Sequence, residues 1–121
     1  MSHCLIQMFA GRYVMALCGS AASFTILENT LKVSGEINMG DGQIFESAVA
    51  SLLATDEKVL VIDLSQVKYM NSSCVRIVAE ALVKAEKRQC RLTVRAKARV
   101  LRLFELVGID RLGVFEEVED D

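Results

Sequence analysis

Residues 59–85 read VLVIDLSQVKYMNSSCVRIVAEALVKA, and this stretch decides the fold. Residues 59–62 are an apolar run rich in β-branched side chains, which is typical of a strand covered on both faces. The run ends at Asp63, and residues 64–70 are predicted to form a turn. Apolar side chains then recur at helical spacing from residue 75 to residue 85. The stretch therefore predicts a strand, a loop and a helix, with three small polar residues at the helix start, Asn71, Ser72 and Ser73.

The position of these polar residues has a physical meaning. The first N–H groups of a helix have no partner inside it, and the helix dipole places partial positive charge there. A serine hydroxyl at this point either caps the helix or carries a phosphate that the same N–H groups stabilise. From spacing alone, the interpretation of Ser72 or Ser73 as an N-cap is favoured.

The same residues resemble a known motif. Asp63-Leu64-Ser65, then Tyr69-Met70-Asn71-Ser72-Ser73, then Arg76 is similar to the central motif of the STAS domain, a family that includes the bacterial anti-sigma factor antagonists. In that family the first serine after an aspartate is phosphorylated by a partner kinase, which is itself the anti-sigma factor. The resemblance implies phosphorylation at Ser72.

Two positions depart from the family pattern, which is roughly D-L-S, a spacer and M-D-S-S-G-L. Asn71 stands where the family has an acidic residue, and Cys74 stands where it has glycine. Asparagine keeps a short capping side chain without the charge. Cysteine adds a side chain where a partner would approach the backbone closely.

The chain before this stretch is predicted to contain a hairpin, a loop and a helix. Residues 24–27 and 31–34 read as strands joined by a tight turn at Glu28-Asn29, because asparagine tolerates positive φ. Residues 35–42 are a loop by their glycines, and they resemble the G-E-L-D segment that borders the phosphorylated serine in STAS domains. The resemblance adds Asn38 and Met39 to the partner-binding residues. Asp41 is a predicted N-cap of the helix that follows.

Later residues complete the pattern. Residues 90–95 alternate as a strand with one solvated face, residues 100–107 form a helix face that stops at Gly108, and residues 113–118 add a short edge strand. Strands separated by helices imply right-handed crossovers and parallel pairing. We therefore predict an α/β fold with a STAS-like mixed sheet: an antiparallel hairpin, then parallel strands, with helices mainly on one face. The predicted core comprises Leu31, Val33, Val59, Val61, Leu92, Val94, Ile44, Phe45, Val49, Leu52, Val75, Val78, Leu82, Leu103 and Phe104.

Residues 1–20 leave two alternatives open, a hairpin turning at Gly11 or one helix face. We treat them as an N-terminal extension, with residues 21–121 as the STAS domain and its short acidic tail. The extension is expected to lie over the second face of the 59–62 strand or to extend the sheet, in the monomer or across a homodimer.

Composition narrows the function. The chain has 121 residues, enough for one core, and its net charge of −2 gives no electrostatic case for nucleic acid. No apolar run approaches the ~20 residues that span a bilayer. Its 4 cysteines are scattered and it has one histidine, so we expect no metal site. Scattered free thiols suit a reducing compartment, so we expect the protein to be located in the cytoplasm. No catalytic set or cofactor motif is present, and we expect no enzyme.

Several side chains have a second interpretation. Asp63 either faces the Ser72 loop or only holds the predicted turn, and we favour the second. Cys74 is either a reactive thiol at a helix start or a small buried residue, and burial is favoured. Arg91, Arg95, Thr93 and Lys32 form a solvated polar face, and Lys97, Arg99 and Arg102 give a mildly basic surface strip.

Two functions follow from the resemblance. The first is an anti-sigma factor antagonist that binds a partner kinase and is switched off by phosphorylation. The second is an interaction subunit, not phosphorylated, of a larger assembly such as a lipid-transport ABC complex or a signalling scaffold. The partner-binding residues that the resemblance implies are Asn38, Met39, Asn71, Ser72, Ser73, Cys74 and Arg76.

Overall fold

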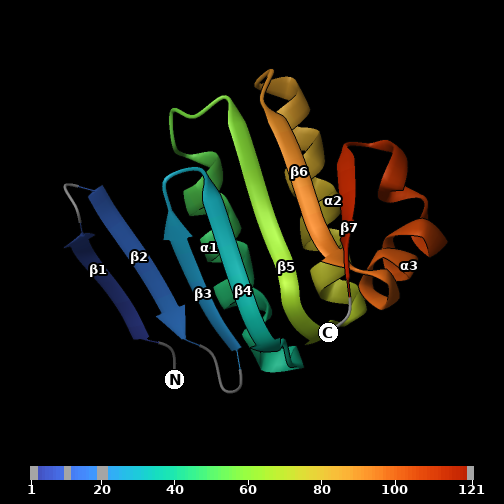
Figure 1. Cartoon of the computed structure of the whole chain (residues 1–121), viewed down its shortest axis with the longest axis horizontal. Helices are drawn as coiled ribbons and strands as arrows, with labels where there is room; N and C mark the ends of the chain where they lie inside the picture. The colour runs from blue at the N-terminus through green and yellow to red at the C-terminus, as the bar shows by residue number, and fades with distance from the viewer. Residues whose placement is uncertain (1–2, 10–11, 19–21, 120–121) are drawn as a thin grey trace.

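A computed structural model describes residues 3–9, 12–18 and 22–119, with side chains from residue 22 onward except that of Met39. Within these residues seven strands form one sheet in chain order (Figure 1). The strands are β1 (His3–Phe9), β2 (Arg12–Cys18), β3 (Ala22–Leu27), β4 (Thr30–Glu36), β5 (Val59–Tyr69), β6 (Arg91–Lys97) and β7 (Val114–Val118).

Strand pairing changes direction at β4. The strands β1 to β4 pair antiparallel, and β4 to β7 pair parallel. The parallel strands are joined through α1 (Gly42–Leu53), α2 (Ser72–Lys87) and α3 (Ala98–Val107), with short 3-10 helices at η1 (Met39–Asp41) and η2 (Ile109–Arg111). Right-handed crossovers that advance in one direction place their helices on one face, and Figure 1 shows α1 and α2 behind the sheet and α3 beside β7. The predicted fold class is confirmed.

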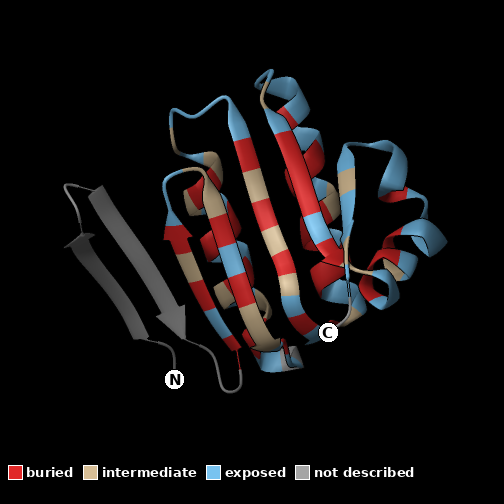
Figure 2. Ribbon diagram, viewed as in Figure 1, coloured by how far each residue is buried: buried red, intermediate tan, exposed pale blue. Residues whose placement is uncertain are grey.

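Burial alternates along the strands (Figure 2). Side chains of one sheet face pack on the helices, while those of the opposite face are exposed or half-buried, except Thr93, which is 9% exposed. Two aromatic contacts join the layers: Phe24 stacks on Phe45 with ring centroids 5.9 Å apart, and Phe104 meets Phe115 at 5.3 Å. The predicted core residues that are buried in this cluster are Leu31, Val33, Phe45, Val49, Leu52, Val75, Val78, Leu82, Leu92, Val94 and Phe104.

The predicted burial of β5 is wrong by one residue. Leu60 and Ile62 are buried, whereas Val59 is 48% exposed and Val61 is half-buried. The strand is therefore covered on one face only, and Val59 and Val61 do not belong to the core. An unbroken apolar run carries no alternation that would set the phase of its side chains. Ile44 and Leu103 are partly buried against the core.

The predicted turn at residues 64–70 is also wrong, because β5 continues to Tyr69. Its pairing with β4 shifts between Lys32↔Asp63 and Ser34↔Gln66, so β5 holds one extra residue there, a β-bulge. The Oδ1 atom of Asp63 accepts the Ser65 N–H at 2.9 Å. Strand β5 therefore includes Asp63, Ser65 and Gln66, although aspartate and serine otherwise favour turns.

The tight turn between β3 and β4 is confirmed, but its positive φ of 58° lies at Glu28 rather than Asn29. The Asn29 side chain instead donates to the Val59 carbonyl at 3.0 Å and ties the turn to β5. Strand β4 includes Gly35 and Glu36, so the loop predicted at residues 35–42 is shorter. The helix stop at Gly108 and the edge strand β7 are confirmed.

Of the two alternatives for the first residues, the hairpin is correct. The strands β1 and β2 pair antiparallel and extend the sheet beyond β3. The turn that was expected at Gly11 lies outside the described residues. The division of the chain into an extension of residues 1–20 and a domain of residues 21–121 stays a prediction.

Candidate functional site

The loops that follow β4 and β5 lie side by side. The two strands are parallel neighbours, and Glu36 pairs with Tyr69 near the carboxyl ends of both. The Ile37 N–H donates to the Tyr69 carbonyl at 3.4 Å. Segments 37–41 and 70–73 therefore meet at one edge of the sheet, the kind of edge where open parallel sheets place their ligands.

Asn71 caps the second of these segments. Its backbone is extended, with φ −92° and ψ 177°, and its Oδ1 accepts the Cys74 N–H at 3.1 Å. The prediction that Ser72 or Ser73 caps α2 is therefore wrong. Asparagine supplies the same short oxygen acceptor one residue earlier, and the cap position falls at the last residue with extended backbone.

Ser72 and Ser73 are the first two residues of α2, and both are exposed. Arg76 follows one turn later on the surface, where its Nη1 pairs with Glu80 Oε1 at 2.7 Å. With the cap supplied by Asn71, the Ser72 side chain stands at the positive end of the α2 dipole without serving as the cap.

Cys74 lies beneath this surface and is fully buried. Burial raises the pKa of its thiol, the hydrogen bond with Asn71 lowers it, and the nearby Asp41 carboxylate raises it, with a net upward direction. This fits the favoured interpretation of a small buried residue. Because Cys74 is 0% exposed, its side chain packs beneath the candidate site, and its role in partner binding stays a prediction.

The neighbouring loop is organised by Asp41. Its Oδ2 accepts the Asn38 N–H at 3.0 Å, and its own N–H donates to the Asn38 carbonyl at 2.9 Å. Asp41 occupies the N-cap position of α1 as predicted, but its side chain makes no capping hydrogen bond to that helix. It is 3% exposed, while Asn38 is exposed. Met39 lies between them in η1.

Sequence reasoning missed three residues here. Tyr69 ends β5 with 59% of its surface exposed, immediately before the Ser72 loop. Gln43 and Glu46 line a surface groove of about 330 Å³ together with Ser73 and Arg76. Tyr69 could have been predicted from the sequence, because it is an aromatic residue within the motif and aromatic residues are enriched in interfaces. Only the packing of α1 beside α2 places Gln43 and Glu46 there.

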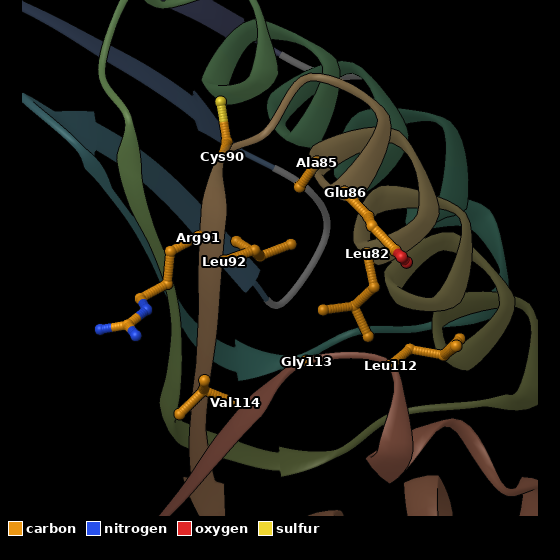
Figure 3. Close-up of a pocket in the computed structure, with 9 residues that line it drawn as sticks. All are labelled: Leu82, Ala85, Glu86, Cys90, Arg91, Leu92, Leu112, Gly113 and Val114. Atoms are coloured by element: carbon orange, nitrogen blue, oxygen red, sulfur yellow. The ribbon is translucent and has the colours of Figure 1, made fainter.

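A second cavity of about 230 Å³ lies toward the other end of α2 (Figure 3). Leu82, Ala85 and Leu92 form its wall, and the Arg91 guanidinium points away on the other side of β6. A Cβ atom on Gly113 would lie 2.5 Å from Leu82 Cδ2, so glycine permits the close approach of the chain before β7. No predicted site residue lines this cavity.

Other polar residues lie outside the candidate site. Asp63 is within β5, and its Oδ2 lies 3.8 Å from Arg95 Nη1 on the open sheet face. Asp63 was expected either to face the Ser72 loop or to hold a turn. It does neither, since it lies at the bulge within β5. Arg99 and Arg102 border a surface hollow together with Glu117 and Glu119, so the strip is not uniformly basic. Thr93, expected on a solvated face, is 9% exposed.

Across residues 3–9, 12–18 and 22–119, none of the helices has the length and apolar character to cross a membrane. The same described residues contain no group of three His, Cys, Asp or Glu side chains suited to a metal ion.

Comparison with known proteins identifies the family. The family model described as "Mlab, STAS domain" matches residues 21–116. A crystal structure of an anti-sigma factor antagonist from Mycobacterium paratuberculosis is similar to the whole chain, with 25% identity, 90% of that chain covered and a TM-score of 0.65. The structure of the anti-sigma factor antagonist SpoIIAA in its unphosphorylated form shares the fold at 13% identity, with 82% of this chain and 90% of that chain covered and a TM-score of 0.61. The comparison with curated proteins finds no match. From the family model, the sheet topology and the motif at the start of α2, we conclude that the chain belongs to the STAS domain family.

Proposed function

We propose that this protein is an anti-sigma factor antagonist-like regulator, which binds a partner kinase through the start of α2 and is released when Ser72 is phosphorylated. One observation supports the proposal above others: Asn71 caps α2, so the exposed Ser72 hydroxyl is not required for the helix start. The partner-binding surface comprises Asn38, Met39, Asn71, Ser72, Ser73 and Arg76, with Cys74 beneath it. In this proposal the protein acts by binding, in the bacterial cytoplasm, and is not itself an enzyme. The kinase catalyses the phosphorylation, and the process that is regulated is transcription.

The physical basis of the switch lies in the partner interface. A phosphate adds about −1.5 to −2 charges at neutral pH. At the start of α2 it meets free N–H groups and the positive end of the dipole, so the domain itself tolerates it. A partner surface fitted to a neutral serine would have to desolvate this charge, and each 1.4 kcal/mol lost there costs about tenfold in affinity.

Variants of the two serines test this function. Ser72→Asp should keep the fold and weaken partner binding by about tenfold or more, while Ser72→Ala should bind constitutively. Ser47→Asp is the matched control, because it makes the same change on an exposed residue of α1 outside the partner-binding surface, and it should leave partner binding unchanged. The partner is first captured from the native host, and mass spectrometry of the native protein locates the phosphate. Tight binding of Ser72→Asp would disprove the switch.

A second function is favoured by a specific observation. The matching family model carries the description "Mlab, STAS domain", and Asn71 and Cys74 depart from the antagonist pattern. An interaction subunit of a lipid-transport ABC complex or a signalling scaffold would carry no phosphate on Ser72. Its binding would be little changed by Ser72→Ala, which separates the two functions.

A further inference from the structure

The sheet face opposite the helices carries a row of alternating charges. The strand register aligns Lys32 on β4, Asp63 on β5, Arg95 on β6 and Glu116 on β7. Within the row, Arg95 Nη1 lies 3.8 Å from Asp63 Oδ2, and Arg95 Nε lies 3.3 Å from Glu116 Oε1. The Arg95 and Glu116 side chains remain 44% and 56% exposed, so both can meet a further charge. Across the sheet, the row is positive, negative, positive, negative.

A row of valine, leucine and threonine side chains runs beside the charged one. The register aligns residues with β-branched or apolar side chains on five successive strands, namely Leu27, Thr30, Val61, Thr93 and Val114. Leu27 and Val114 are 42% and 43% exposed, and Val59 on the same face is 48% exposed. Figure 2 shows this open face toward the reader, with exposed and half-buried segments between the buried ones. Exposed apolar side chains beside exposed charges are typical of the border of a protein-binding surface.

We propose that this open face binds the same face of a second copy of the protein. The order of the charges makes the row complementary to itself. Consider a two-fold axis that runs nearly parallel to the strands and passes between β5 and β6. It places β4 of one copy opposite β7 of the other and β5 opposite β6, and each row of residues faces the same row of the second copy. Lys32 then faces Glu116 of the partner subunit, and Asp63 faces the partner subunit's Arg95. In the neighbouring row Val61 lies over Thr93 and Thr30 lies over Val114 of the other copy, which covers the exposed surface of Val61 and Val114. Face-to-face sheets pack about 10 Å apart, a distance that these long charged side chains can bridge.

The outer pair of the row provides a sharp test. Lys32 and Glu116 are three strand spacings apart within one chain, about 14 Å, so they do not pair with each other in the monomer. Lys32→Glu places two carboxylates opposite each other at both outer positions of the dimer, and Glu116→Lys places two ammonium groups opposite each other there. Each single variant should raise the dimer dissociation constant about tenfold to a hundredfold in sedimentation equilibrium at low salt. The double variant should restore the wild-type value.

Mixing the two single variants gives the decisive measurement. A heterodimer of Lys32→Glu with Glu116→Lys has opposite charges at both outer positions, so two monomeric solutions should dimerise when combined. Arg102→Glu is the control, since it makes the same change in net charge as Lys32→Glu on the exposed part of α3. It should leave the wild-type dimer unchanged. Circular dichroism melting of each variant confirms that it is folded.

The outcomes separate this interface from others. Rescue by the double variant and by mixing supports contact between open faces, because neither is expected from damage to the monomer. A wild-type protein that stays monomeric to sub-millimolar concentration overturns the proposal. A dimer that neither single variant weakens also overturns it and places the interface elsewhere, such as the free edge of β1.

Discussion

Cys74 shows how one residue connects the surface of the candidate site to the core. Its backbone N–H completes the Asn71 cap, while its side chain is buried below the exposed Ser72. A glycine at this position would give the same cap without filling the core. The departure from the family pattern therefore changes packing beneath the site rather than the chemistry at its surface.

The raised pKa of the Cys74 thiol predicts a pH dependence of stability. In the unfolded chain the thiol ionises near its ordinary value of 9.0, whereas the buried thiol stays neutral to higher pH. The free energy of unfolding should be unaffected by this group below that value and should fall as pH rises from it through the folded-state pKa. Urea denaturation across the pH range on either side of that value measures this slope. Cys74→Ala should flatten this slope, because it removes the titrating group.

At the scale of elements, α3 stops where a left-handed residue is needed. Gly108 has φ 78°, and no atom lies within 4 Å of the position that a Cβ would occupy. Gly108→Ala should therefore cost about 1–2 kcal/mol from backbone strain alone. Gly42→Ala, at φ −58° in the first position of α1 with equal space around it, should stabilise by about 0.4–1 kcal/mol. Chemical denaturation of both variants checks the opposite signs, and equal effects would contradict the strain argument.

The strands β1 and β2 also act as an element, because they cover the edge of β3. Removing residues 1–20 would leave the N–H and C=O groups of that edge unpaired, a common cause of aggregation. We expect a lower melting temperature or lower solubility for the truncated chain. An unchanged melting temperature and monodisperse light scattering would show that these strands are dispensable.

At the scale of the whole molecule, one core joins the sheet to its three helices. Phe45 holds α1 against β3, and Phe104 holds α3 against β7, and both are fully buried. Phe45→Ala and Phe104→Ala should each cost about 3–5 kcal/mol in the free energy of unfolding. Leu106→Ala, which removes a side chain that is 82% exposed on α3, should change stability by less than about 0.5 kcal/mol. Similar losses for all three variants would mean that the core is placed wrongly.

Much of the candidate site was predictable because it is local in sequence. Asn71, Ser72, Ser73 and Arg76 lie within two helical turns, and their motif places them on one helix start. Asn38 came from a second short motif, and the parallel pairing of β4 with β5 brings it to the same edge. Gln43 and Glu46 acquired their positions through the packing of α1 beside α2, between segments that are about thirty residues apart, and no local pattern indicates such contacts.

By itself, the sequence determined the kind and order of most elements, the hairpin before α1 and the stop at Gly108, since each depends on neighbouring residues. Only the tertiary structure decided three other features. These are which face of β5 is buried, how far that strand extends, and which residue caps α2. Burial of Leu60 in place of Val61 depends on the position of the helices, which an unalternating apolar run does not encode. The extension through Asp63 depends on pairing with β4, whose ladder hydrogen bonds outweigh the turn preference of the residues in between.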